Sequence, residues 1–551
     1  MTQMKRPQSR YAFGTFALYP SNDTCTGWLK VHRRKKPRQR DASLQQLSVL
    51  PYVGTIIVLL GSFLNIVSPG LKNLSWRSGH RTNAEIQKLQ QLFPVHVNNE
   101  MEKIRHPGFQ LSDPDRLAAV MDGLAVPETI EVPTFWDPPP YDGVRNFLGD
   151  NGRYLITKEE ASAIGSIHQG KETIFVMVAS YRDPECRPTV EDLFLRAKYP
   201  ERIRVAIIDQ RSSVDGDPVC GVNERECEQN PSQPLCQYRN LIDYMEYEAQ
   251  LMVGPTFARH LGHRMYRGEY FVMQVDSHIR MVTDWDNDII QQWKSIGNEM
   301  AVMSTYLNDV TNSIDPVSHQ SLRQTRAIMC NAEFEWKGDS KEHIKFNVQP
   351  SNKPRMESSP MLHPFWAAGF SFARGHFGVQ VPYDSQLPFV FQGEEISMTV
   401  RGFTYGYDFY APVRNVAYHI YATRQNRENR LNVRTFTENA ALFPGAKEQA
   451  YHRLNRIIGL GKLDIDFDHS DESVYGLGQV RTADKFYRTF GIHVDTSEIE
   501  QGLCDFVQGL RGYRSMHEEF TPFLRDNGMG INYSKIKFEH KEKPMMDSPV
   551  D

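Results

Sequence analysis

Long hydrophobic runs are scarce in this chain of 551 residues. The mean hydropathy is −0.51, which excludes a membrane protein with many spans. The chain also has no large excess of one charge, because it contains 63 Lys and Arg and 67 Asp and Glu. That balance argues against a chain that binds nucleic acid over its whole length, and no nucleic-acid partner is expected. No internal repeat is present in the sequence. A chain of this length predicts about two to four ordinary domains.

One uncharged run stands out, LSVLPYVGTIIVLLGSFLNIV at residues 47–67. Its length matches the roughly 20 residues that cross a bilayer as a helix. Residues 1–46 carry a net charge of +8, and cationic flanks stay on the cytosolic side of a membrane. We therefore predict a basic cytosolic tail at 1–46 and a transmembrane signal anchor at 47–67. The alternatives are a buried core helix and a cleaved signal peptide.

This topology places the rest of the chain in the lumen of the secretory pathway. A short basic tail, one span and a lumenal body are typical of Golgi enzymes. We therefore expect a single-pass protein of the Golgi or endoplasmic reticulum membrane. Residues 68–168 contain proline-dense stretches such as VPTFWDPPPYDG at 132–143 and have weak periodicity, which indicates a stem.

Cysteine is also scarce, with seven in the chain. One lies in the tail, and an even number is left for the lumen, which permits up to three disulfides. These six are Cys186, Cys220, Cys227, Cys236, Cys330 and Cys504. Three of them crowd a polar segment, residues 215–236, that disulfides would order. The alternative is a zinc site, although the spacings fit zinc poorly.

Apolar runs of strand length alternate with helical patterns from Thr173 onward. The strands are expected at 173–180, 204–208, 270–275 and 300–306, and helices begin near Thr189, Pro255 and Asp284. This alternation predicts an α/β fold with an open sheet, in which ligands bind at the carboxyl ends of the strands. We assign residues 169–430 to a catalytic domain. Residues 431–551 look mainly helical, as in EQAYHRLNRIIGL at 448–460, and form an extension.

Asp276-Ser-His278 follows the third of these strands. In strand geometry residues i and i+2 point the same way, so Asp276 and His278 can share one divalent ion. A carboxylate with an imidazole suits Mn²⁺ better than Mg²⁺. His419 follows another strand-like stretch and is a candidate third ligand, although a lone histidine is more often structural. The rival acidic groups are Asp215 with Asp217, Asp284 with Asp286, and the loop at 464–468; each also fits a turn, a helix start or a solvated face.

Glu394 and Glu395 begin another expected helix, EEISMTVRGFTYG. Paired carboxylates at a helix start have a plain explanation, their favourable interaction with the helix dipole. They can also face a substrate. Upstream, HPFWAAGFSFARG at 363–375 combines aromatic and small residues. It could form a sugar platform with a close backbone approach, or a pair of core strands.

Seven motifs in order make the chain resemble the glycosyltransferases that add N-acetylglucosamine to protein hydroxyls. That family includes the Skp1 hydroxyproline N-acetylglucosaminyltransferase of slime moulds and trypanosomatid mucin-type enzymes. The motifs are IFVMVASYRDPEC (174–186), GPTFARH (254–260), QVDSH (274–278), WAAGFSFARG (366–375), GEEISMTVRGFTYGYDFYAP (393–412), AYHIY (417–421) and YGLGQVRT (475–482). The resemblance spans about 173 to the 490s.

The resemblance implies a GT-A nucleotide-diphospho-sugar transferase fold and a retaining mechanism. It implies a metal site for Mn²⁺ or Mg²⁺ formed by Asp276, His278 and His419. Glu394 or Glu395 would face the sugar and the acceptor as the catalytic pair. The residues expected at the donor are Ser180, Tyr181, Arg182, Asp183, Asp209, Arg259, Trp366 and Gly369.

The expected activity is therefore transfer of a sugar from a UDP-sugar to a hydroxyl of a protein or glycoprotein, with N-acetylglucosamine implied by the resemblance. The slime-mould enzyme is cytoplasmic, whereas this chain carries a predicted anchor, so a secretory acceptor is expected. One alternative is a GT-A hexosyltransferase that acts on glycans or glycolipids. Another is a non-catalytic, membrane-tethered sugar-binding protein.

The predicted topology can be tested at two glycosylation sequons, which begin at Asn73 and Asn22. Asn73 follows the predicted anchor and should carry a glycan, because oligosaccharides are attached in the lumen. Asn22 lies in the tail and should not. We expect the Asn73→Gln variant alone to lose a glycosidase-sensitive mobility shift. Loss of a shift only in Asn22→Gln would invert the topology.

Overall fold

The computed structural model describes residues 101–109, 126–134 and 158–541. The last range has gaps at 338–339, 351–352, 357–358, 424–425, 427–429, 431–432 and 461–466. The predicted tail and anchor and most of the predicted stem lie outside the described residues. Within the described ranges, no helix has the length and apolar character that a membrane span requires.

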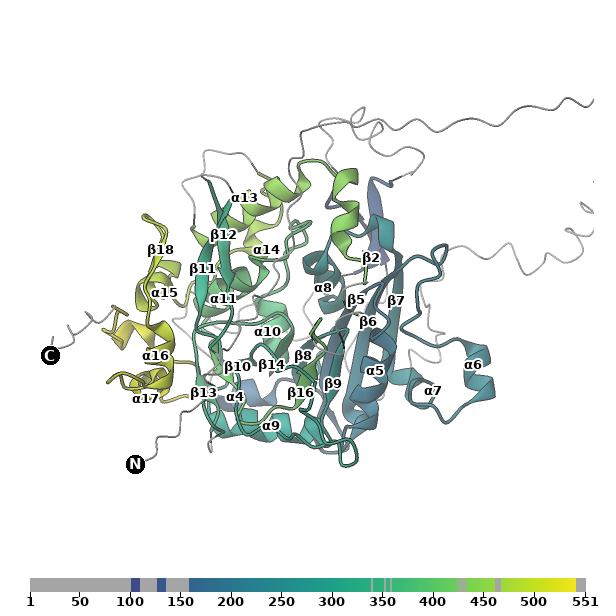
Figure 1. Ribbon diagram of the computed structural model, residues 1–551, viewed down its shortest axis with the longest axis horizontal. Coiled ribbons are helices and arrows are strands. Elements are labelled where there is room, and N and C mark those ends of the chain that lie inside the picture. The colour runs from purple at the N-terminus through teal and green to yellow at the C-terminus, as the bar shows by residue number, and fades with distance from the viewer. Residues whose placement is uncertain are drawn as a thin grey trace, which may run out of the picture. The chain divides into compact units, whose positions relative to one another are not determined.

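An eight-stranded sheet forms the centre, in the order β13-β15-β10-β14-β8-β5-β6-β7 (Figure 1). Its strands, in chain order, are β5 (Ile174–Tyr181), β6 (Ile203–Arg211), β7 (Ile242–Glu248), β8 (Phe271–Asp276), β10 (Ala301–Ser304), β13 (Met361–Leu362), β14 (Phe370–Arg374) and β15 (Asp408–Ala411). The four strands from β8 to β7 are parallel, as the alternation predicts. The other half is mixed, because β14 runs antiparallel to both β8 and β10.

Both faces of the sheet are buried, which explains why its central strands are continuous apolar runs rather than alternating ones. On β5, Val176 and Val178 belong to one core cluster. Phe175 and Met177, on the opposite face, belong to another. The edge strand β7 instead alternates between buried and partly exposed residues. Its sequence, IDYMEYE, carries three acidic residues, and it is not among the strands expected from apolar runs.

Helices follow the strands as the sequence predicts, with shifted ends. The helix expected from Thr189 begins three residues earlier, as α5 (Cys186–Leu195). The other principal helices are α8 (Pro255–His263), α9 (Trp285–Ile296), α10 (Gly375–Gln380), α11 (Glu394–Thr404) and α13 (Ala446–Ile458). Gly393, immediately before α11, has φ +99°, a backbone conformation that favours glycine.

The described part of the predicted stem packs on the body. β1 (Met101–Arg105) and β2 (Thr129–Pro133) form an antiparallel pair. The hydroxyl of Tyr247 donates to the carbonyl of Glu131 at 3.3 Å. His106 Nε2 lies 2.7 Å from the carbonyl oxygen of Leu251. These residues are therefore part of the folded body, and where a stem ends stays a prediction.

The described residues after α13 contain short helices and one pair of short strands but consist largely of turns and irregular structure, unlike the mainly helical extension expected from the sequence. Strand β18 of this segment lies beside β11 (Ala332–Lys337) at the left of Figure 1. A buried ion pair of 2.8 Å between Arg481 and Asp408 ties the segment to the sheet. Its elements are α14 (Glu472–Tyr475), α15 (Ala483–Thr489), β17 (Ile492–His493), β18 (Glu498–Ile499), α16 (Leu503–Gln508) and α17 (Met516–Phe520). The remaining short elements are α4 (Lys158–Ala163), β3 (Ile167–His168), β4 (Lys171–Glu172), α6 (Glu224–Gln229), α7 (Pro234–Gln237), β9 (Ile279–Met281), β11 (Ala332–Lys337), β12 (Ser340–Phe346) and β16 (Ala417–His419).

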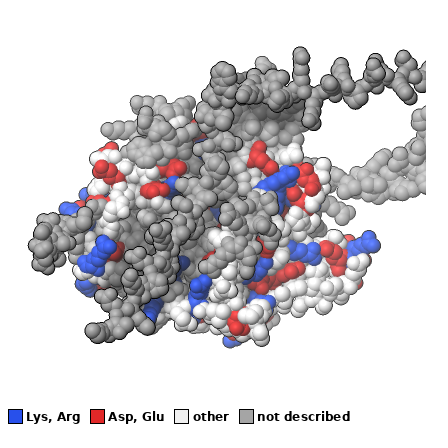
Figure 2. Space-filling model, viewed as in Figure 1, with Lys and Arg blue, Asp and Glu red and all other residues white. Residues whose placement is uncertain are grey.

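Charged side chains of both signs are intermixed on the face drawn in Figure 2, among the described residues. This pattern agrees with the near-balanced composition.

The six cysteines that follow the predicted tail all pair. The disulfides are Cys186–Cys220, Cys227–Cys236 and Cys330–Cys504. The polar segment therefore contains one local bridge and a second that joins it to the start of α5, and the expectation of disulfides is confirmed over the zinc alternative. The third bridge connects the C-terminal helices to the residues before β11, across 174 positions of sequence.

The long bridge should contribute more to stability than the local one, because closing a longer loop removes more entropy from the unfolded chain. We expect replacement of Cys330 and Cys504 by serine to lower the free energy of unfolding by about 2–5 kcal/mol. The matched control replaces Cys227 and Cys236, only nine positions apart, and should cost less. Urea titration of both variants measures this. Equal losses would contradict the loop-length argument.

Candidate metal centre and active site

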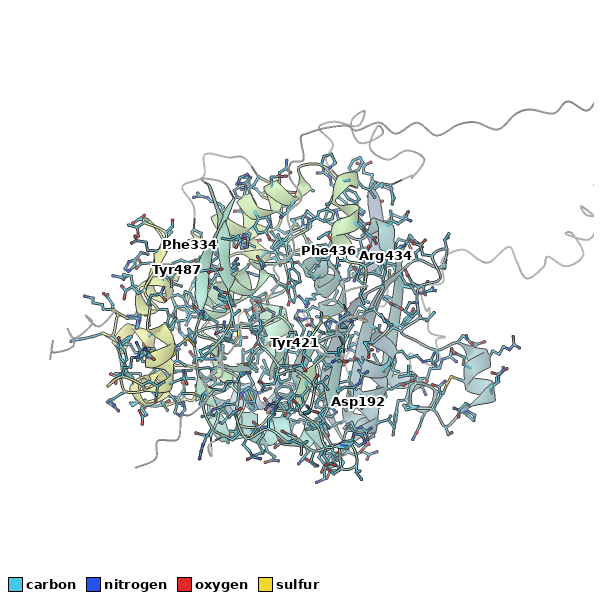
Figure 3. All side chains as sticks on the ribbon, in the orientation of Figure 1. Asp192, Phe334, Tyr421, Arg434, Phe436 and Tyr487 are labelled. Atoms are coloured by element: carbon cyan, nitrogen blue, oxygen red, sulfur yellow. A yellow bond between two sulfur atoms is a disulfide. The ribbon has the colours of Figure 1, made fainter. Side chains whose placement is uncertain are left out.

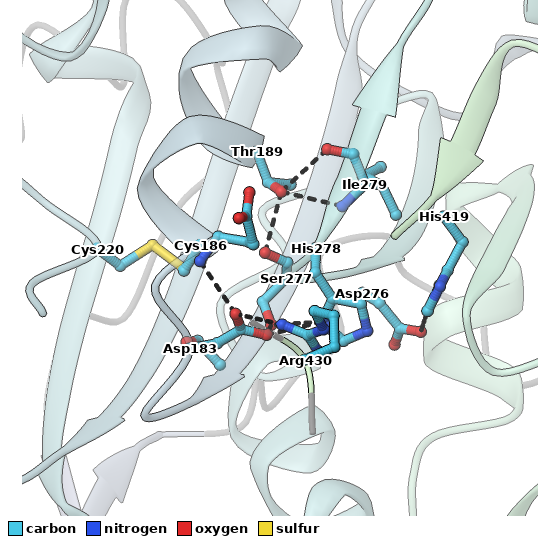
Figure 4. Close-up of polar contacts among 12 residues, drawn as sticks. Asp183, Cys186, Thr189, Cys220, Asp276, Ser277, His278, Ile279, His419 and Arg430 are labelled. Atoms are coloured by element: carbon cyan, nitrogen blue, oxygen red, sulfur yellow. Dashed lines mark hydrogen bonds and ion pairs between the residues drawn. A yellow bond between two sulfur atoms is a disulfide. The ribbon is translucent and has the colours of Figure 1, made fainter. Parts of the chain in front are cut away.

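Three sequence-predicted metal ligands come together at the carboxyl end of β8. The strand ends at Asp276, and His278 follows it. β9 then pairs with β16, which places His419 opposite Ile279. One ligand atom from each of Asp276, His278 and His419 lies within 4.8 Å of the others (Figure 4). Asp276 and His278 are two residues apart in the sequence. The pairing of β9 with β16 brings His419 to them across 140 residues of sequence.

Asp183 holds His278 in one orientation. Its Oδ2 lies 2.7 Å from His278 Nδ1, which leaves Nε2 of the ring for an ion. The Ser277 hydroxyl donates to the same oxygen, and Arg430 donates to Oδ1 at 2.8 Å (Figure 4). Burial alone would raise the pKa of Asp183, but these partners hold it well below its ordinary value. A carboxylate behind a ligating histidine is the usual support of a protein metal site.

The donor set fits a divalent cation. His419 Nε2 lies 3.3 Å from Asp276 Oδ2. Burial above all lowers the pKa of His419 to about 4, so the ring is neutral near pH 7 and can ligate. Burial would raise the pKa of Asp276, but His419 and Arg259 outweigh it and keep the carboxylate ionised. One carboxylate oxygen and two imidazoles suit a transition-metal ion such as Mn²⁺ better than Mg²⁺.

Arg259 on α8 joins the metal site to the start of α11. Its Nη2 donates to Asp276 at 2.9 Å, and its Nη1 contacts both oxygens of Glu394 at 2.5 and 2.7 Å. Burial raises the pKa of Glu394, and the guanidinium opposes that rise. The predicted donor-binding arginine and the first predicted catalytic glutamate therefore form one ion-paired unit with Asp276, a predicted metal ligand.

Gly369 provides the close backbone approach expected of the 363–375 segment. Its carbonyl accepts a hydrogen bond from the Asp276 N–H at 3.3 Å. A Cβ atom at this position would lie 2.8 Å from Asp276 Oδ2. Only glycine leaves that oxygen in place. The alternative of core strands also holds in part, since the next residues form the buried strand β14.

Glu395, the second predicted catalytic residue, has different partners. The Ala368 N–H donates to Oε1 at 2.9 Å, and the Tyr306 hydroxyl donates to Oε2 at 2.5 Å. Burial raises the pKa of Glu395 to about 7, and these two donors limit the rise. The two adjacent glutamates thus differ: Glu394 is paired with a cation, whereas Glu395 has only neutral donors.

Tyr306 and Tyr421 are two residues of this region that the sequence analysis missed. Both keep partial solvent exposure, as do the three metal ligands and Glu395, whereas the strands beneath them are buried. The ring of Tyr421 packs on His419 with 4.0 Å between centroids, and its hydroxyl donates to the Leu307 carbonyl at 3.0 Å. Figure 3 places Tyr421 near the centre of the view. Their positions in the sequence could have indicated both residues, because Tyr306 follows a strand and Tyr421 lies two residues beyond His419.

Tyr181 and Arg182 form ion pairs and hydrogen bonds within the chain. Arg182 contacts Asp215 at 2.8 Å, Asp217 at 2.9 Å and Glu438 at 2.9 Å. Tyr181 donates to Glu438 at 2.7 Å. Asp215 and Asp217, a rival acidic pair, thus serve as partners of Arg182. The donor-binding roles of Tyr181 and Arg182 stay predictions.

Three more predicted donor residues are buried. Ser180 is at the end of β5, beside Asp209 of β6. Asp209 accepts the Cys220 N–H at 2.9 Å and the Tyr244 hydroxyl at 2.7 Å, and burial raises its pKa to about 6. Trp366 is 1% exposed in the core, where its indole N–H donates to Ser371.

The other acidic rivals are not joined to the metal cluster. Asp286 is fully buried, accepts the Lys198 N–H at 2.6 Å and pairs with Arg202 at 2.6 Å. It therefore anchors the start of α9. Of the 464–468 loop, residues 464–466 lie outside the described residues, and Asp468 accepts a hydrogen bond from the Ser470 N–H at 2.9 Å.

This site and sheet belong to a known class of enzyme. The family described as glycosyltransferase (GlcNAc) matches residues 173–234 and 217–496, which is more than half of the chain. The chain therefore belongs to this glycosyltransferase family. The matched range includes Asp276, His278, His419 and both glutamates.

Similar solved structures are also glycosyltransferases. GalNAc-T7, solved with UDP, GalNAc and Mn²⁺, is 14% identical over 55% of this chain and 54% of its own, with a TM-score of 0.35. Residues 1–349 of S. aureus TarS, solved with UDP-GlcNAc, are 11% identical over 58% of this chain and 73% of their own, with a TM-score of 0.30. The chain thus spans about half the length of the GalNAc-T7 chain. No curated protein sequence matches it.

The contact between Gly369 and Asp276 gives a direct test of the metal site. Gly369→Ala should push the Asp276 carboxylate out of place and weaken Mn²⁺ binding about 10- to 100-fold, as expected for a change behind a ligand. Calorimetric titration with Mn²⁺ measures this. The matched control is Gly378→Ala, where the new Cβ would meet Val272 at an ordinary 3.6 Å. Unchanged Mn²⁺ affinity in Gly369→Ala would place the ion elsewhere.

Proposed function

We propose that this protein is a metal-dependent, retaining glycosyltransferase with a GT-A fold, which moves N-acetylglucosamine from UDP-N-acetylglucosamine to a hydroxyl of a protein or glycoprotein. The observation that carries the proposal is the Asp276, His278 and His419 cluster, supported by Asp183, at the carboxyl end of β8. In open α/β sheets this edge is where ligands bind. The family description supports the sugar.

Asp276, His278 and His419 would hold the cation, Mn²⁺ in preference to Mg²⁺. When bound, the cation neutralises charge that develops on the diphosphate leaving group. The chain adds its own cations at the same place. Arg259 contacts Asp276, and Arg430 contacts Asp183, so both guanidinium groups lie beside the metal ligands. Fixed cations that face a leaving group stabilise its developing charge without reorganisation.

Glu394 and Glu395 have different roles in the proposed site. Glu394 is held by Arg259 on both oxygens and therefore positions that arginine against Asp276. Glu395 keeps partial exposure and has no cationic partner among its hydrogen bonds to described residues. We therefore assign contact with the sugar or the acceptor hydroxyl to Glu395. This refines a prediction that left the choice between them open.

The disulfides support an acceptor in the secretory pathway. Three bridges persist only in an oxidising compartment, such as the lumen of the endoplasmic reticulum. With the predicted anchor, they favour a Golgi or endoplasmic reticulum membrane protein whose catalytic domain is lumenal. A hexosyltransferase acting on glycans or glycolipids remains the second candidate, because the metal site would serve any UDP-sugar.

A donor panel tests the proposal. Purified full-length protein with Mn²⁺ should release UDP from UDP-N-acetylglucosamine faster than from UDP-glucose, UDP-galactose or UDP-N-acetylgalactosamine, and chelation of the metal should stop release. Asp276→Asn should lower the rate about 100-fold or more, because a metal ligand is lost. Asp495→Asn removes an exposed carboxylate and is the control.

Each outcome of the donor panel favours one of the candidate functions or overturns the metal-dependent mechanism. Preference for UDP-glucose or UDP-galactose would favour the hexosyltransferase. Release that persists after chelation, or in Asp276→Asn, would overturn the metal-dependent mechanism. No release from any donor would favour a non-catalytic sugar-binding protein.

A further inference from the structure

Tyr306 lies beyond the end of β10, on the same edge of the sheet as the metal cluster. Because β10 runs parallel to β8, with β14 between them, the residues after both strands meet at one edge. Tyr306 is partly exposed there, and its hydroxyl donates to Glu395 at 2.5 Å. Neither the family comparison nor the sequence motifs assign it a role.

The two donors to Glu395 fix both of its oxygens. The Ala368 N–H binds Oε1 and the Tyr306 hydroxyl binds Oε2. Each carboxylate oxygen has a second lone pair, so the group can still accept a hydrogen bond from outside the protein. Glu395 is also partly exposed.

We propose that Tyr306 is a positioning residue that orients Glu395 and favours its ionised form, so that Glu395 accepts a hydrogen bond from a hydroxyl of the substrate. The inference rests on the proposed function and deepens it. Tyr306 acts only through Glu395 and is not required to touch the substrate.

The chemistry of the pair favours this arrangement over simple packing. Burial raises the pKa of the Tyr306 phenol far above its ordinary range, so it stays a neutral donor at every relevant pH. A fixed donor stabilises a carboxylate over a carboxylic acid. Tyr487 in α15 provides a contrast: its hydroxyl donates to the backbone carbonyl of Ile458, where no ionisable group is involved.

Other titratable groups around Glu395 come from its own helix and from two further elements. Glu394 on α11 raises the pKa of Glu395, and Arg259 on α8 lowers it. Tyr421, after β16, has its own pKa raised partly by the charge of Glu395. With burial, these groups set the pKa of Glu395 to about 7. The ionised fraction at neutral pH therefore depends closely on each donor, Tyr306 included.

The test is the pH dependence of transfer in Tyr306→Phe, measured with Mn²⁺ and the donor that the panel identifies. Activity should require ionised Glu395, so the acid limb of the kcat/KM profile should move to higher pH by about one unit when the donor is lost. Substitution of 3-fluorotyrosine at position 306 strengthens the donor and should move the limb to lower pH. UDP affinity should change in neither variant.

Tyr487→Phe is the matched control, since it removes a buried tyrosine hydroxyl among the C-terminal helices, apart from Tyr421 in Figure 3. It should leave the acid limb in place. A limb that does not move in Tyr306→Phe and in the fluorotyrosine protein would overturn the inference, as would equal movement in the control.

A second readout separates this inference from the proposed function. The infrared carbonyl band of protonated Glu395, taken as the difference from Glu395→Gln, reports its ionisation without any substrate. Its midpoint should rise by about one pH unit in Tyr306→Phe. If no UDP-sugar is turned over, the proposed function fails, and the infrared midpoint still decides whether Tyr306 controls Glu395. An unchanged midpoint would overturn the inference by itself.

Discussion

The buried guanidinium of Arg259 lies between two carboxylates that could not otherwise share this site. Asp276 comes from a strand and Glu394 from the start of a helix, and each contacts Arg259 within 3 Å. Two like charges in a partly buried site repel strongly, and one cation between them turns that repulsion into attraction. Loss of Arg259 would remove the guanidinium that both carboxylates contact, and Asp276 would keep His419 as a partner. The predicted metal ligand Asp276 and the glutamate Glu394 therefore depend on a residue that is not itself a predicted ligand.

The parallel half of the fold was predictable because its strands are buried on both faces and read as apolar runs. β5, β6 and β8 lie within a few residues of their expected ends. β7 was not predictable in this way, because an edge strand alternates and carries charge. The direction of β14 was also hidden, since no local pattern encodes whether a strand runs with or against its neighbours.

The candidate site likewise combines residues that a local pattern predicts with residues that only the fold brings together. The Asp276 and His278 pair follows from local strand geometry. His419 was a candidate from its place after a strand-like stretch, and the family resemblance added to its case. Tyr306 and the pairing of the six cysteines depend on contacts between distant segments, which spacing does not encode. The difference between Glu394 and Glu395 likewise arises from which helix or loop faces each carboxylate. Trp366 was expected at the donor. In the structure it lies in the core, and its indole N–H donates to the Ser371 hydroxyl.

The reversed strand β14 has a consequence for which loops reach the candidate site. In an all-parallel sheet the loops that precede strands lie at the edge opposite the ligand. Here Phe370, the first residue of β14, pairs with Val275 near the end of β8, so the loop before β14 arrives at the active edge. That loop supplies Gly369 and Ala368, while the parallel strands supply Asp183 and Asp276. The loop before β14 and the ends of the parallel strands thus come from separate halves of the sheet, yet they meet at one edge, where the Gly369 carbonyl accepts from the Asp276 N–H.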